Sequence, residues 1–126
     1  MAGNVVQDKS FHFAVAIVPV CRKIAKEHNE FVLSRQLLRS GTSIGANIEE
    51  AIGGLSRADF AAKLGIAYKE ARATSYWLRL LKETGLLSED DFRGLYNDAE
   101  ELCRLIASIH KKAKVPIPRV DSISNS

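Results

Sequence analysis

The 126-residue chain has only two cysteines, three histidines and three prolines. Cys21 and Cys103 stand far apart, without a CxxC pair or a histidine at zinc-ligand spacing, so we expect them to be small buried residues in a reducing compartment. The Glu-x-x-His pairs that hold metals in helical bundles are missing, as are a glycine-rich phosphate loop and a nucleophile elbow. These absences predict a protein without a metal, a cofactor or an enzyme active site.

Long apolar runs are missing as well. No uncharged stretch reaches the ~18 residues that a membrane-spanning helix requires, and no apolar run follows a basic N-terminus. The sequence therefore predicts a cytoplasmic protein that does not interact with a membrane. Its net charge is +3, a mild excess that permits a polyanionic partner without requiring one.

What the sequence does contain is a helical repeat of apolar residues in four segments. The first runs from about Ser10, the expected N-cap, to Glu27, with a kink expected at Pro19. The second runs from about Glu30 to Gly53, where a glycine in the left-handed conformation is expected to end the helix.

The third segment begins at the N-cap Ser56 and is ended by Gly85, and the fourth begins at Ser88. The expected core positions are Phe13, Ile17, Val20, Ile24, Leu37, Ile44, Ile48, Ile52, Leu55, Phe60, Leu64, Ala67, Ala71, Thr74, Leu78, Leu81, Phe92, Leu95, Ala99, Leu102, Ile106 and Ile109. Short loops between long helices favour an all-α, up-down-up-down antiparallel four-helix bundle over residues 1–113. Residues 114–126, with two prolines, are expected to form a flexible tail.

Two features of the second and third segments could determine how the helices pack against each other. Gly41 and Gly45 in the second segment indicate close helix packing, or else a bare backbone that receives a ligand. The expected structural clamp between the second and third segments is Asn47, Glu50 and Glu70, with a buried Asn47–Glu70 contact; the alternative is a functional polar pocket.

The third segment also carries a second apolar stripe, formed by Ile66, Ala73, Trp77 and Leu80. This stripe is either the other flank of a wide core face or a subunit interface. In the second case, Tyr76, Trp77 and Leu80 are the expected oligomer interface.

Two motifs carry a resemblance to a known family. The segment from Arg35 through Gly41-Thr42-Ser43-Ile44-Gly45-Ala46-Asn47 to Ala51, followed by the run from Phe60 to Leu81, resembles bacterial four-helix-bundle proteins first met in intervening sequences of large-subunit ribosomal RNA genes. This resemblance implies a homopentameric, barrel-like ring. It also implies a relation to the accessory protein of diversity-generating retroelements, which binds nucleic acid and a reverse transcriptase through a basic surface.

The charge distribution favours the third segment, together with the second, as a nucleic-acid interface. The candidate binding residues are Arg39, Lys63, Lys69, Arg72 and Arg79. A charged helix face is often simply solvated, but a ring would multiply a small patch on each subunit. We therefore expect a non-catalytic oligomeric scaffold for RNA, another nucleic acid, or a protein partner that carries nucleic acid.

One pattern supports a different function. Arg104 and His110, separated by five residues, resemble the Arg-x4-6-His motif of helical RNases of the HEPN class. Such a pair could stabilise a scissile phosphate and transfer a proton. The alternative interpretation is an exposed arginine and a histidine near the end of a helix.

Overall fold

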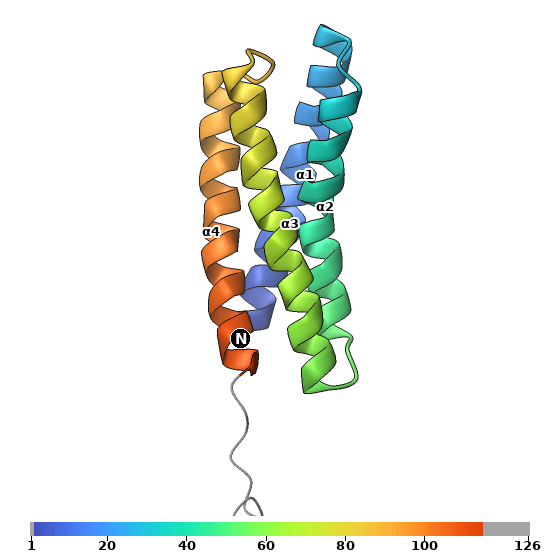
Figure 1. Cartoon of the computed structure of the whole chain (residues 1–126), viewed down its shortest axis with the longest axis vertical. Coiled ribbons are helices and arrows are strands. Elements are labelled where there is room, and N and C mark those ends of the chain that lie inside the picture. The colour runs from blue at the N-terminus through green and yellow to red at the C-terminus, as the bar shows by residue number, and fades with distance from the viewer. Residues whose placement is uncertain (1, 115–126) are drawn as a thin grey trace, which may run out of the picture.

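The computed structural model describes residues 2–114, which form four helices and no strand (Figure 1). They are α1 (Ala2–His28), α2 (Val32–Ile52), α3 (Arg57–Glu83) and α4 (Glu89–Lys114). Successive helices run antiparallel, and each packs against its two neighbours around the bundle, including α1 against α4. The predicted all-α four-helix bundle is confirmed. The predicted tail lies outside the described residues except for Lys114, the last residue of α4.

The apolar core follows the helical repeat closely. Among the fully buried side chains are Ile17, Leu37, Ile44, Leu78 and Ile106, contributed by all four helices. No helix within residues 2–114 has the length and apolar character needed to span a membrane.

The predicted start of α1 is wrong, because the helix begins at Ala2 rather than at Ser10. Val6 is buried and continues the apolar stripe toward the N-terminus. Ser10 is itself a buried stripe position, and its hydroxyl donates to the Gln7 carbonyl, 3.1 Å away. In the sequence, a serine at a buried position inside a helix can therefore be mistaken for the N-cap residue of that helix. Pro19 lies within α1 and does not end it.

The end of α2 also differs from the prediction. Gly53 has φ −81°, so no left-handed glycine ends this helix. Ala51 is the last buried residue, whereas Ile52 is 45% exposed and Leu55 is 99% exposed. The chain leaves the core at this point, so the prediction of Ile52 and Leu55 as core positions is wrong. Gly54 instead permits a close approach, because a Cβ there would stand 2.8 Å from Asp59 Oδ2.

The boundaries of α3 and α4 agree with the sequence. The Ser56 hydroxyl accepts a hydrogen bond from the Asp59 amide at 3.0 Å, and Ser88 accepts one from the Asp91 amide at 3.2 Å. Gly85 follows α3 with φ +77°, a left-handed conformation that favours glycine.

The two glycines of α2 bring it close to α1. A Cβ on Gly41 would lie 3.2 Å from two side-chain carbons of Ile17, and one on Gly45 would lie 3.3 Å from the Ser10 carbonyl oxygen. These contacts confirm the close helix packing that the sequence indicated.

Candidate nucleic-acid and assembly surfaces

Two ion pairs and one buried hydrogen bond join α2 to α3. The Arg39 guanidinium donates to both carboxylate oxygens of Glu70, at 3.0 and 3.3 Å. Lys63 Nζ lies 2.7 Å from Glu50 Oε1, and this contact raises the pKa of Lys63. Because the pairs lie at different levels of the bundle, together they fix the register of the two helices.

The hydrogen bond lies close to the Arg39–Glu70 pair along the bundle, and inside the core. Thr74 Oγ1 is 3.0 Å from Ser40 Oγ, and both residues are fully buried. Each hydroxyl also lies near a backbone carbonyl of its own helix: Ser40 Oγ is 3.3 Å from the Leu37 oxygen, and Thr74 Oγ1 is 2.8 Å from the Glu70 oxygen. The polar contact that crosses the core is therefore a small one between two hydroxyls.

The predicted Asn47–Glu70 contact is wrong. Asn47 is half-buried, and its Nδ2 donates to the Ser43 carbonyl of its own helix at 2.8 Å. The carboxylate of Glu70 is used by Arg39 instead. Glu50 and Glu70 do join the helices, but their partners are two residues that the sequence had assigned to nucleic acid.

The three remaining basic candidates form an exposed stripe on α3. Lys69, Arg72 and Arg79 share one face of the helix with Tyr76, at intervals of three, four and three residues. This face points away from both neighbouring helices, because Glu70 contacts α2 on one side and Ser75 contacts Glu100 of α4 on the other. Within residues 2–114, none of the three basic side chains has an ion-pair partner.

The predicted interface residues continue this surface toward the C-terminal end of α3. Tyr76 is 50% exposed, while Trp77 and Leu80 are half-buried. Trp77 packs against the core, and its ring meets that of Tyr76 edge to face, with 5.1 Å between the centroids. The second stripe of α3 is thus partly core flank and partly exposed surface.

A second apolar surface, which the sequence analysis missed, lies between α1 and α2. We call it the α1–α2 groove; it is lined by Val18, Cys21, Arg22, Ala25, Phe31, Ser34, Arg35 and Leu38. Phe31 is 52% exposed, and Arg22 and Arg35 are exposed beside it. A single helix does not reveal this groove, because its two walls come from different helices.

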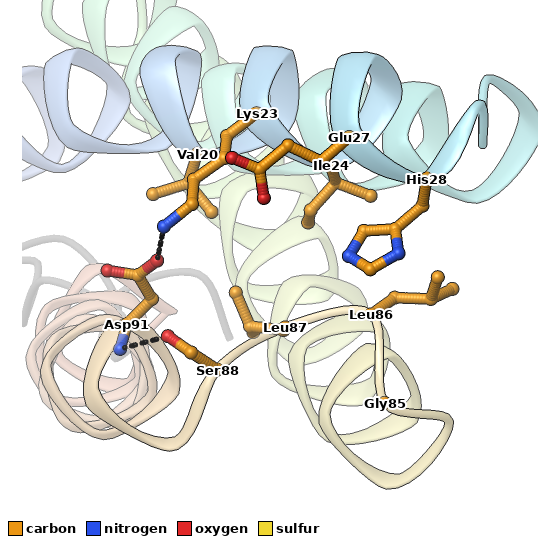
Figure 2. A pocket seen from close by; sticks show the side chains of 10 residues that line it. All are labelled: Val20, Lys23, Ile24, Glu27, His28, Gly85, Leu86, Leu87, Ser88 and Asp91. Carbon is orange, nitrogen blue, oxygen red and sulfur yellow. Dashed lines mark hydrogen bonds and ion pairs between the residues drawn. The ribbon is translucent and has the colours of Figure 1, made fainter.

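A hollow of mixed character lies where the end of α1 meets the α3–α4 turn (Figure 2). Leu87 and Ile24 line its apolar part, and Lys23 Nζ pairs with Asp91 Oδ2 at 3.4 Å. A similar pair, Lys9 with Glu101 at 3.3 Å, joins the same two helices nearer the other end. Exposed ion pairs therefore close the seam between α1 and α4.

Comparison with known proteins identifies the family. Residues 3–108 match the family model of the 23S rRNA-intervening sequence proteins. The chain belongs to this family. A crystal structure from Bacteroides thetaiotaomicron, described as a protein of unknown function from the S23 ribosomal protein family, is 51% identical. Its TM-score is 0.85, and the match covers 88% of this chain and 99% of that one. No curated protein matches the chain.

The two residues that resemble a helical RNase motif have different surroundings in this member of the 23S rRNA-intervening sequence family. Arg104 is exposed, whereas His110 is half-buried and faces α3, where a Cβ on Gly65 would lie 3.3 Å from its Nε2. Six positions along a helix turn two side chains roughly 120° apart, so Arg104 and His110 point in different directions. Residues 2–114 contain no group of three or more His, Cys, Asp or Glu side chains placed to hold a metal ion.

Proposed function

We propose that the protein is a non-catalytic scaffold that assembles with copies of itself and binds RNA through the basic stripe of α3. The observation that carries this proposal is that Lys69, Arg72 and Arg79 are exposed and lack ion-pair partners within residues 2–114. Such cations can displace the counterions condensed on a polyanion, and the released ions favour binding. The proposal leaves Arg39 and Lys63 out of the stripe, because each already pairs with a carboxylate of the facing helix.

The stripe favours binding to the phosphate backbone over reading of bases. It offers three cations and one exposed aromatic ring, Tyr76, on a helix whose other faces are packed against neighbours. Base-specific recognition of RNA uses several aromatic rings or side chains that reach base edges. We therefore expect affinity with little sequence preference.

Assembly would make a short stripe sufficient. Two or three phosphate contacts per subunit would bind RNA weakly, but a ring of five copies, as the family resemblance implies, would present about ten. The affinity of such a ring for RNA should fall steeply as salt rises from low to physiological concentration.

The test is the affinity for a fluorescent single-stranded RNA, measured by anisotropy across a salt series. Lys69→Ala combined with Arg72→Ala should weaken binding and flatten the plot of log affinity against log salt by about 0.7 for each phosphate that the variant no longer neutralises. The matched control removes the same charge elsewhere, with Lys9→Ala and Lys23→Ala, whose side chains face carboxylates of α4. This control should bind nearly as the wild type does.

Three outcomes would contradict the RNA-binding proposal. The first is binding that is insensitive to salt or selective for sequence, and the second is an equal loss of affinity in both double variants. The third is no binding at low salt, which would leave assembly with a protein partner. RNA recovered from the samples should be intact, and cleavage that disappears in His110→Ala would support the RNase alternative instead.

A further inference from the structure

Two arginines on neighbouring helices lie at nearly the same level of the bundle, where α3 meets α4. The Ser75 hydroxyl of α3 donates to Glu100 of α4 at 2.8 Å, and this contact sets the register of the two helices. Arg72 lies three residues before Ser75 on α3. Arg104 lies four residues after Glu100 on α4. Because the helices run antiparallel (Figure 1), both arginines lie on the same side of the contact, about 4.5 and 6 Å from it along the bundle.

The bundle leaves both guanidinium groups available. Arg72 and Arg104 are exposed, and neither has an ion-pair partner within residues 2–114. Burial is the main cause that raises the pKa of the Cys103 thiol, whereas the charges of Arg72 and Arg104 both act to lower it. Since both charges act on the same buried thiol of α4, the two arginines flank the same stretch of the seam between α3 and α4.

One carboxylate lies beside the two arginines. Glu100 precedes Arg104 by four residues, so the two side chains share one flank of α4. The Glu100 carboxylate accepts a hydrogen bond from Ser75 and forms no ion pair with either arginine within residues 2–114. It therefore lowers the positive potential at this place without neutralising a particular guanidinium group.

We infer that the RNA-binding surface continues from α3 across this seam onto α4, where Arg72 and Arg104 bind one phosphate group of the RNA between them. Guanidinium groups suit this role, because their planar set of N–H donors matches the oxygens of a phosphate. The inference rests on the proposed function and adds Arg104, a residue outside the α3 stripe. Lys111 is also exposed, two turns further along the same flank of α4, and would extend the surface in that direction.

The first test removes one arginine. Arg104→Ala should weaken the binding of a fluorescent single-stranded RNA, and it should flatten the plot of log affinity against log salt by about 0.7 for each phosphate that is no longer neutralised. Arg22→Ala is the matched control, because Arg22 is an exposed arginine of the α1–α2 groove, on the other side of the bundle. Combining Arg104→Ala with Arg72→Ala should cost less than the sum of the two separate losses, because either change alone already breaks the shared contact.

The second test changes the affinity in the opposite direction. Glu100→Gln removes the negative charge beside the two arginines, while its amide oxygen can still accept the Ser75 hydrogen bond. RNA should therefore bind at least about twofold more tightly at low salt. Glu101→Gln is the matched control, because Glu101 pairs with Lys9 of α1 and so lies on the other flank of α4. Its effect on the affinity should be much smaller.

Several outcomes would overturn the inference. They are an affinity that Arg104→Ala or Glu100→Gln leaves unchanged, and a loss in Arg22→Ala as large as that in Arg104→Ala. If Lys69→Ala with Arg72→Ala still weakens binding in that case, the proposed function stands and its surface is confined to α3. Native mass spectra of all variants should match the wild type, and the RNA should stay intact. A changed oligomer, or cleavage that Arg104→Ala abolishes, would assign Arg104 to assembly or catalysis instead. A wild type that binds no RNA at low salt would remove the proposed function itself.

Discussion

Replacing Gly41 with valine tests the close packing of α1 on α2. A Cβ at this position would lie 3.2 Å from Cγ1 and Cγ2 of Ile17, closer than the ~3.5–4.0 Å of a relaxed carbon contact. Ile17 is fully buried and has little room to move. Valine adds two methyl groups to this contact, and overpacking of this kind costs about 1–3 kcal/mol. Its better helix propensity returns only about 0.4 kcal/mol.

We therefore expect Gly41→Val to lower the free energy of unfolding by about 2 kcal/mol, and the melting temperature by about 8 °C. The measurement is thermal unfolding followed by circular dichroism at one fixed protein concentration, because assembly would make the midpoint depend on concentration. Gly94→Ala is the control. A Cβ on Gly94 meets nothing within 4 Å, so this change should stabilise the helix by about 1 kcal/mol.

A double-mutant cycle identifies Ile17 as the cause. Ile17→Ala alone should cost about 2–5 kcal/mol, because it leaves a cavity in the core. In the Gly41→Val background the new methyl groups would fill part of that cavity, so the combined cost should be at least about 1 kcal/mol below the sum of the separate costs. Additive costs, or a Gly41→Val variant that melts with the wild type, would refute the close packing of these two residues.

The buried thiol and Asn47 provide two more tests. Burial raises the pKa of Cys21 to about 12, so the folded protein holds this proton more tightly than the unfolded chain, whose thiol has a pKa of 9.0. The contribution of this bound proton to the free energy of unfolding is therefore complete below pH 9.0 and is lost as the pH rises from 9.0 toward 12. Over this pH range, the urea midpoint of Cys21→Ala should fall less than that of the wild type. Asn47→Leu should change the unfolding free energy by less than about 1 kcal/mol, because the one side-chain hydrogen bond of Asn47 within residues 2–114 goes to the Ser43 carbonyl of its own helix. A loss of about 2 kcal/mol or more, measured in urea, would indicate a polar contact across the helices.

The sequence predicted the helices well where core pattern and boundary signal agreed. Ser56 and Gly85 bracket α3 as expected, because a hydroxyl at an N-cap and a glycine with positive φ satisfy the ends of a helix locally. Ser10 misled because the same residue type also serves inside a stripe, where its small side chain lets the backbone of Gly45 approach. Local chemistry does not distinguish these two uses; the buried Val6 upstream does.

The candidate site was less predictable, because pairing between helices depends on register. Spacing placed Arg39, Glu50, Lys63 and Glu70 on facing helices, but it did not show which charge meets which. In the bundle each basic residue of this group meets a carboxylate, so their charges are compensated within α2 and α3. A count of basic residues along α3 therefore overstates the charge that remains for a polyanion.

The proposed RNA-binding surface lies on the outer face of α3, where the bundle leaves basic side chains exposed. A side chain can bind a partner only if the bundle leaves it accessible, and the core packing of the described helices takes up most of their large aliphatic side chains. Lys69 and Arg72 have no carboxylate as an ion-pair partner within residues 2–114. Phe31 and Tyr76 are large aromatic side chains that remain about half exposed. No ion pair within residues 2–114 uses the charge of Lys69 or Arg72, whereas the Tyr76 ring also meets the ring of Trp77 edge to face. Substituting Lys69 or Arg72 with alanine should therefore weaken RNA binding while leaving the unfolding free energy of the monomer within about 0.5 kcal/mol of the wild type.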